Sequence, residues 1–335
     1  MTLTARLHRG ITWTGADALH AALSVVPAVA LAAGGNVAGG AAAAVGVLPV
    51  GLVGITALRR SRVEAIGIGV LFAAGVVAGS ELARTAVTAV AAMAVLPYLC
   101  SLLAASRPLG RLMLVMILPS LSVGLSLQPP SHSFGLAAII AAGSVWSGLL
   151  ALAWPEREAP APPAAPPMPM AAARRYGLLL GATAGTATMI GELLHVDHLG
   201  WAATAALLVM RPQPDLLKVR GVGRIGATLT GALLAHLMLG LHTPVALYAV
   251  AIAAATVAAV ATRTSRWYLT SGSTGFLVLV LSLYGHASQA EIRHTFWARV
   301  SETLLGVALA YLFGVLVPLA LSRRAAARAP GRPPP

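Results

Sequence analysis

Residues 198–234 read HLGWAATAALLVMRPQPDLLKVRGVGRIGATLTGALL, and this stretch decides how the chain folds. An apolar run rises to Met210 and ends at Arg211-Pro212, where proline opposes continuation of a helix. A basic loop with the only lysine, Lys218, follows, and a Gly- and Thr-rich apolar run begins at Arg224. The pattern predicts two apolar helices joined by a basic turn.

The whole chain repeats this character. It has 335 residues, of which 58% are hydrophobic and 10% charged, with a mean hydropathy of +0.82. A soluble domain is about 25% charged. The apolar runs are continuous and rich in Ala, Leu and Gly, which favours helices over alternating strands. Many are long enough to cross the roughly 30 Å hydrocarbon core of a bilayer. The fold class predicted is therefore all-α and polytopic in the membrane.

We expect about twelve transmembrane helices in two six-helix halves. Residues 155–173 are rich in Pro and Ala and predict an extended cytoplasmic linker. The linker separates a first membrane half, 1–154, from a second, 174–322, and residues 323–335 form a basic tail predicted to be disordered. The expected spans are 16–33, 37–58, 63–80, 84–105, 109–127, 133–153, 177–194, 198–210, 222–240, 244–262, 267–285 and 297–321.

The positive charges predict the orientation of these spans. With a cytoplasmic N-terminus, every Arg and Lys lies on the cytoplasmic side except Arg84, Arg293 and Arg299. This asymmetry follows the positive-inside rule and predicts that both termini are cytoplasmic. The net charge of +13 is thereby explained without nucleic acid. The preference for Arg over Lys, with abundant Ala, Gly and Pro, is typical of a GC-rich bacterial genome.

One short motif recurs at three places. Arg62, Arg224 and Arg299 are each followed by Ile or Val and, seven residues after the Arg, by Gly. The last two also share Thr228 and Thr303, so Arg, Thr and Gly form one stripe on a helix. The spacing of Arg62 and Arg224 favours a parallel duplication, whereas Arg224 and Arg299 would enter from opposite sides. The stripes serve either helix packing or a substrate path.

These residues carry a family resemblance. The order is WAATAALLVMRPQPD, then R-x-x-x-T-x-x-G from Arg224, then R-x-x-E-T-L-L-G from Arg299. It resembles the fusaric acid resistance and aromatic acid exporter superfamily of inner-membrane transporters, over 177–321. The resemblance implies export of organic, often aromatic, carboxylates, and plant relatives are anion channels. The larger members carry sizeable cytoplasmic domains, in whose place this chain has only the linker and the tail.

Charged residues inside spans are costly and are the first candidates for function. Glu302 follows Arg299 on the same face and forms either a local ion pair or a titrating carboxylate beside an anion site. Trp201 is either an interfacial anchor or a surface that stacks on an aromatic substrate. Asp17 is interpreted as an N-terminal helix cap or a partner of the helix dipole. His195, Asp197 and His198 form a weak metal motif, and we expect no metal, no cofactor and no enzymatic activity.

The function expected is a secondary transporter in a bacterial cell membrane that exports organic carboxylates. The alternatives are a passive anion channel and a non-transporting scaffold, and a homo-oligomer is left open. The expected substrate path comprises His198, Trp201, Arg224, Thr228, Arg299, Glu302 and Thr303. The observation that would test this path most directly is whether Arg224, Arg299 and Glu302 line a cavity between the halves. Leu199 to Met210 would be about 18 Å long, so we expect the outer end of this short span to be buried more deeply than a loop.

Overall fold

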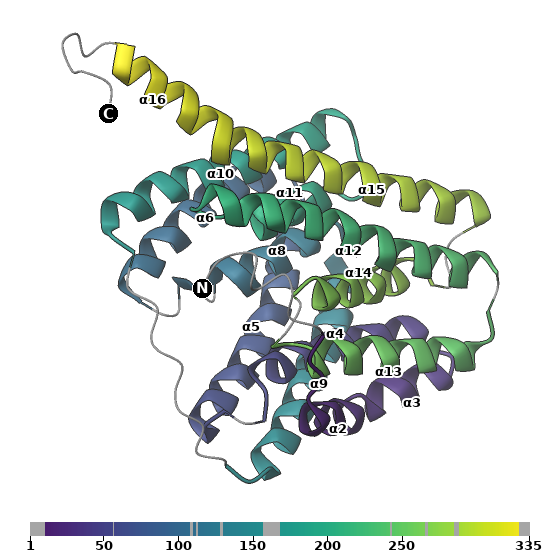
Figure 1. Cartoon of the computed structure of the whole chain (residues 1–335). Helices are drawn as coiled ribbons and strands as arrows, with labels where there is room; N and C mark the ends of the chain where they lie inside the picture. The colour runs from purple at the N-terminus through teal and green to yellow at the C-terminus, as the bar shows by residue number, and fades with distance from the viewer. Residues whose placement is uncertain are drawn as a thin grey trace.

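The computed structural model describes residues 11–327 except 56, 108–109, 112, 128–129, 157–167, 242, 265–266 and 285–287. All regular structure in these residues is helical, which confirms the all-α fold (Figure 1). The first half holds α2 (Gly15–Ser24), α3 (Val26–Ala33), α4 (Val37–Val53), α5 (Arg59–Leu82), α6 (Ala86–Ser106), the π-helical turn η1 (Met113–Ile117), α8 (Leu118–Gly124) and α9 (Pro130–Ala153). The second half holds α10 (Met170–Leu193), α11 (Gly200–Val209), α12 (Pro214–Gly240), α13 (Val245–Ala261), α14 (Trp267–Leu283), α15 (Gln289–Tyr311), the π-helical turn η2 (Leu312–Leu316) and α16 (Val317–Ala327).

Helices occupy the positions of all the predicted spans, but they differ in length. Among the described residues, five helices are long and apolar enough to cross a membrane: α5, α6, α9, α12 and the continuous run of α15, η2 and α16. A sixth is α2 with α3, which bend by 44° where Pro27 follows the break at Val25. The other apolar helices are shorter. A helical membrane protein is thus established, whereas twelve crossings and cytoplasmic termini stay predictions.

Two short helices, α4 and α11, lie in the interior. Nearly every residue of each is buried, including the glycines and alanines on all sides. A helix that is apolar all round belongs in a core or a membrane, so both are central helices around which their halves pack. The α11 helix has 10 residues and is about 15 Å long. It is therefore half the thickness of the hydrocarbon core, as the short predicted span suggested.

The two halves share one pattern of helix contacts. In the first half α4 packs against α9 and α5, and in the second α11 packs against α15 and α12. Likewise α5 packs against α8, and α12 against α14. The halves also interlock in a reciprocal way: α6 lies against α10 and α8 against α11, while α13 lies against α2 and α3 and α14 against α4. This is the contact pattern of a duplicated unit packed about a twofold axis.

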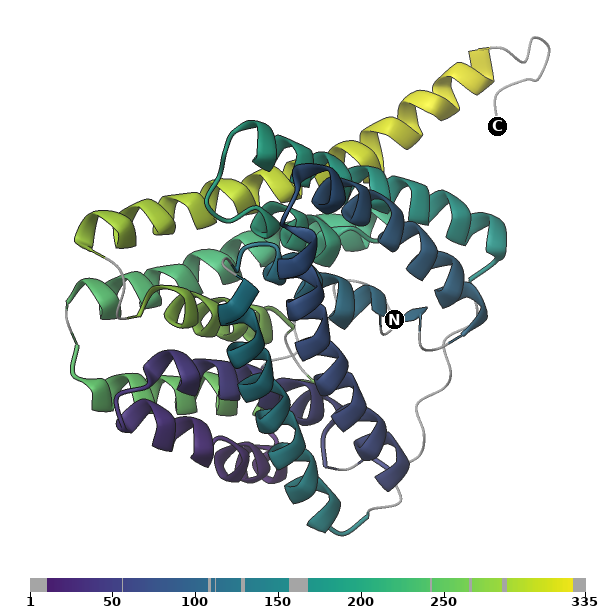
Figure 2. The ribbon, with the colours of Figure 1, turned by 180° about the vertical axis from the view of Figure 1, so that it is seen from behind.

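The helices α12 and α15 run side by side in opposite directions (Figure 1). The Nε2 of Gln289, at the start of α15, donates to the carbonyl of Gly240, at the end of α12. The antiparallel entry predicted for Arg224 and Arg299 is therefore correct. The pair α5 and α9, also side by side, lies at a steep angle to α12 and α15 (Figure 2).

Several predicted boundaries are wrong in a way that matters for the site. The helices α12 and α15 begin eight residues before the spans predicted at 222 and 297. Pro214 and Asp215 favour the first turn of α12, and a capping box of Ser288 and Glu291 starts α15. Arg224 and Arg299 therefore lie about 15 Å inside their helices. The predicted spans instead placed both residues near the span starts at 222 and 297.

The linker and the tail are also shorter than predicted. The α10 helix begins at Met170, so 170–173 are helical, and α16 extends to Ala327, so 323–327 are helical rather than disordered. Alanine is the best helix former, and both segments are rich in it. Residues 157–167 and 328–335 lie outside the described part of the chain.

Candidate functional site

Six of the predicted path residues come together where α11, α12 and α15 meet. We call this set the polar cluster: Trp201, Arg224, Thr228, Arg299, Glu302 and Thr303. Each is between 1% and 5% exposed. The two Arg-Thr stripes face one another across α12 and α15, with Thr228 and Thr303 on either side of a gap of about 10 Å³. Such a gap holds at most one water molecule.

The two buried charged residues of α15, Arg299 and Glu302, have side-chain atoms without a hydrogen-bond partner among the described residues. These atoms are Nε and Nη1 of Arg299 and both carboxylate oxygens of Glu302. The guanidinium of Arg299 instead lies 4.5 Å from the ring centre of Trp201 in a cation–π contact. The hydrogen-bonded local pair considered for Arg299 and Glu302 is thus not formed. A buried charge without a partner is expensive, so these groups call for a function.

Arg224 has one partner. Its Nη1 donates to Oγ of Ser271 on α14, and its buried Nε has no partner in the described part of the chain. Sequence reasoning did not select Ser271. The signal available was the small-residue run TSGSTG at 270–275, which allows α14 to approach α12 closely.

The cluster carries an excess of positive charge. Arg224 and Arg299 interact electrostatically, and Glu302 is the carboxylate coupled to Arg299. The buried site therefore holds two guanidinium groups and one carboxyl group, which lies near Arg299. Arginine presents a planar fork that bonds both oxygens of a carboxylate, so a bound organic anion would supply the missing counter-charge.

The first half provides an internal control for this site. Gly143 of α9 approaches the carbonyl of Ala43 on α4 as Gly306 of α15 approaches that of Ala202 on α11. When the two helix contacts are aligned on these glycines, Leu136, Ile139, Ile140 and Ala42 take the places of Arg299, Glu302, Thr303 and Trp201. The scaffold therefore packs without these polar groups, so packing alone does not explain them.

Arg62, in the first-half copy of the motif, has a different role. It is fully buried at the start of α5, and its guanidinium donates to the carbonyls of Ala57, Ala151, Trp154 and Pro155. Ala151 is in the last turn of α9, Trp154 and Pro155 directly follow that helix, and Ala57 precedes α5, so Arg62 joins the end of α9 to the start of α5. Arg62 is thus a structural clamp, and the motif alone does not indicate a substrate site.

The outer end of α11 was expected to be buried more deeply than a loop, and this is true of only part of it. His198 is half-buried, and its ring stacks on Trp201 at 3.8 Å. His198 lies in the loop before the helix, where burial lowers its pKa to about 4, with Arg299 adding to the effect and Asp197 opposing it. The imidazole is therefore neutral at neutral pH. His195 and Asp197 are exposed, contrary to the prediction.

Trp201 is not an interfacial anchor, because it is 1% exposed and covered by His198 and Arg299.

The loop before α11 is held to α15 by one contact, in which Oδ2 of Asp197 lies 3.1 Å from Nε2 of His294. Among the described residues no group of three His, Cys, Asp or Glu side chains could hold a metal ion.

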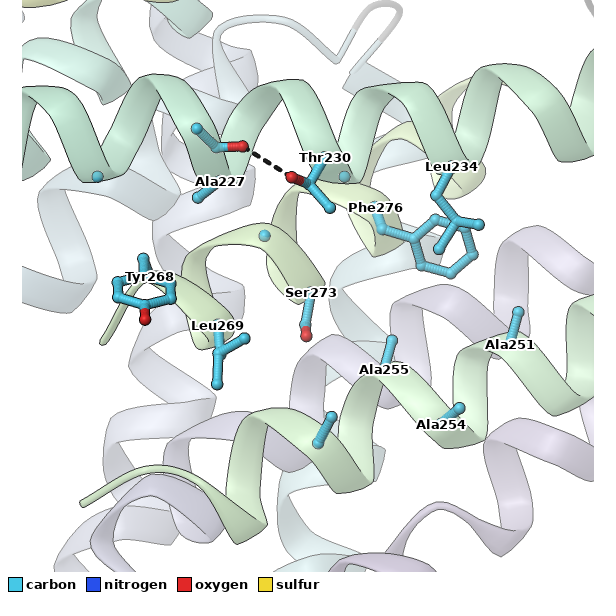
Figure 3. A pocket seen from close by; sticks show the side chains of 15 residues that line it. Ala227, Thr230, Leu234, Ala251, Ala254, Ala255, Tyr268, Leu269, Ser273 and Phe276 are labelled. Carbon is cyan, nitrogen blue, oxygen red and sulfur yellow. Dashed lines mark hydrogen bonds between the residues drawn. The ribbon is translucent and has the colours of Figure 1, made fainter. Parts of the chain in front are cut away.

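The structure has a large cavity that lies apart from the polar cluster. A cavity of about 790 Å³ lies within the second half, between α12, α13 and α14 (Figure 3). Arg224, Arg299 and Glu302 do not line it. This cavity is therefore separate from the polar cluster. The polar cluster is closed on all sides.

A second buried charge has a partner in the other half of the chain. Asp17, taken as a helix cap, is fully buried, and its Oδ2 lies 3.0 Å from Nε of Arg263 at the end of α13. The pair joins the first half to the second. Asp17 does lie in the first turn of α2, but its partner in the other half was not predictable from spacing along one helix.

The fold and the buried charges define a multi-pass membrane protein with an internal polar site. Residues 186–313 match the family described as fusaric acid resistance protein-like, a family of the membrane transport and resistance class. The match supports the family resemblance found in the sequence, and the matched residues contain the whole polar cluster. No curated protein and no solved structure matched the chain.

Proposed function

We propose that the chain is a bacterial cell-membrane transporter, not an enzyme, that exports organic carboxylates, with aromatic acids as the first candidates. The substrate carboxylate binds between Arg224 and Arg299. The observation that carries the proposal is the buried charge excess of the polar cluster, which the first half replaces with apolar residues at the same helix contact. The family match over the same residues agrees with it.

The closed cluster fits an occluded state of a transport cycle. Glu302 is the one carboxylate there, and a substrate anion would compete with it for Arg299. Movement of α12 against α15 would open the site to one side at a time, since the two stripes meet along this antiparallel contact. Coupling to protons through Glu302 distinguishes this transporter from a passive anion channel.

The test is uptake of radiolabelled benzoate into proteoliposomes that contain the full chain. Arg299→Gln and Glu302→Gln are compared with Arg293→Gln, which changes an exposed residue of the same helix. We expect Arg299→Gln to abolish benzoate flux and Glu302→Gln to abolish its dependence on a pH gradient, with Arg293→Gln like the wild type. The neutral isostere benzamide should not compete. Unchanged flux in both cluster variants would refute the site.

A further inference from the structure

The cavity between α12, α13 and α14 is a lateral groove. We use the name portal groove for the space lined by small residues of all three helices, with Gly226, Thr230 and Leu234 on α12, Ala254 on α13 and Ser273 on α14 (Figure 3). The helices α12 and α13 are consecutive, yet each packs mainly on other helices, and α14 forms the floor. The four residues named on α12 and α13 are exposed. The helix α12 is a candidate membrane span, so lipid would have access to the mouth of the groove.

The segment at the corresponding position of the first half carries larger side chains. There the segment before α8 is the π-helical turn η1, whose sequence MLVMI contacts both α5 and α6. Met113 and Leu114 pack into the core beside them. In the second half α14 begins WYLTSGSTG, and its small residues leave the space open. The portal groove is therefore a feature of the half that also holds the polar cluster.

One end of the groove is basic. Its lining ends at Gly223 and Tyr268, and there the guanidinium of Arg220 lies 5.2 Å from the ring centre of Trp267. Arg211 and Lys218 precede Arg220, and the acidic residue between 211 and 224 is Asp215 alone. The lining itself carries no charged side chain. A groove with an apolar lining and a positive charge at one end, next to Trp267, is complementary to an anion with an apolar body.

We propose that the portal groove takes up amphipathic carboxylates from the bilayer, with the apolar body in the groove and the carboxylate at Arg220. Arg224 lies one helical turn further along α12 and leads from this position to the polar cluster. The inference rests on the proposed function and specifies its substrate: a free carboxylate with an apolar body of drug-like size, which reaches the protein sideways from the lipid. A volume of about 790 Å³ is within the usual range of small-molecule sites.

The test is photolabelling in phosphatidylcholine liposomes with a long-chain fatty acid that carries a diazirine near its methyl end. Gly226→Leu narrows the groove at a position where an added side chain meets no atom within 4 Å. Gly67→Leu is the matched control, an exposed glycine of α5 with equally open surroundings. We expect labels on α13 and α14 that fall about tenfold in Gly226→Leu and are unchanged in Gly67→Leu. Ala254→Leu, at another exposed wall position, should act like Gly226→Leu.

Arg220→Gln tests the head-group position. It should weaken labelling by the fatty acid about tenfold, since a charge-assisted hydrogen bond is lost, and leave labelling by the corresponding alcohol unchanged. Equal labelling in Gly226→Leu and wild type would overturn the proposal. If a diazirine phosphatidylcholine labelled the groove as strongly as the fatty acid, the groove would be a general lipid site and the proposal would be wrong. If the fatty acid gave no label and Gly226→Leu dissociated a dimer, the groove would be a self-association face and the proposal would likewise be wrong. Normal benzoate flux alongside any of these outcomes would leave the proposed function intact.

Discussion

The two halves of the chain use one scaffold for two purposes. In the first half the contact of α4 with α9 is apolar, with Leu136, Ile139 and Ile140 facing the core. In the second half the equivalent contact of α11 with α15 carries Arg299 and Glu302. Since the first-half contact packs with apolar residues alone, we expect that Arg299 and Glu302 are not required for folding. The difference marks the second half as the part of the molecule that handles charge.

The largest effect is expected when the second half is made to resemble the first. The double variant Arg299→Leu/Glu302→Ile should lower benzoate flux by about 100-fold or more, because a buried charge contact of about 3 kcal/mol is lost. Its stability should be unchanged or higher by about 1–4 kcal/mol, as for other buried ion sets replaced by apolar residues. Flux and thermal unfolding in detergent measure the two effects. Full flux, or collapse of the fold, would break the comparison.

Arg62 and Arg224 should respond in opposite ways. Arg62→Leu removes the donors for four carbonyls, so we expect unfolding to become easier by about 3 kcal/mol or more, with flux per folded molecule retained. Arg224→Leu removes one bond, to Ser271, and should reduce flux strongly with a smaller change in stability. Thermal unfolding and flux at matched amounts of folded protein give both quantities. If Arg62→Leu lowered flux as much as Arg224→Leu, the two motifs would not have separate roles.

The ion pair of Asp17 and Arg263 should affect how the halves hold together. Arg263→Gln leaves the Asp17 carboxylate buried without its cation, and we expect a loss of about 3 kcal/mol. Asp17→Asn should lower the stability by less, because the Arg263 side chain left without its partner is more exposed than that of Asp17. In the double variant the losses should be less than additive, and denaturant titration measures this. Additive losses would mean that the pair is not coupled.

The smallest effects are expected at the shared glycine contacts. Gly143→Ala and Gly306→Ala would each bring a Cβ to 2.3 Å from a backbone oxygen, of Ala43 and Ala202 respectively. Overpacking of this kind costs about 1–3 kcal/mol. Equal losses of thermal stability in the two variants would support the alignment of the halves. A loss in only one of them would mean that the alignment of Leu136 with Arg299 is incorrect.

The sequence was sufficient for the all-α fold class, and it singled out the residues that gather in the polar cluster. Continuous apolar runs predicted the helices, and the Arg-Thr-Gly stripes predicted that α12 and α15 would present Arg224, Thr228, Arg299 and Thr303 together. Helix starts were misplaced because hydropathy follows the membrane, whereas capping by Pro214 and Ser288 sets the helix. The domain boundary at 155–173 stays a prediction.

Features that join distant segments were not predictable from one sequence. The pair of Asp17 and Arg263 links residues 246 positions apart, and Ser271 is 47 positions from Arg224. The interlocking of α6 with α10 and of α13 with α2 and α3 is likewise invisible in local patterns. The position of the cavity also depends on contacts between distant segments. The helix α14 packs on α4, and the small residues of α14 leave space beside α12 and α13.

The most direct test of the account is whether benzoate stabilises the protein through the charges of the second half. At a concentration about 100 times the Kd, a ligand that binds only the folded state adds about 2.7 kcal/mol to its stability. We predict that benzoate raises the Tm of the purified wild type, that benzamide does not, and that Arg299→Leu/Glu302→Ile shows no shift. An equal benzoate shift in the double variant would contradict the central claim.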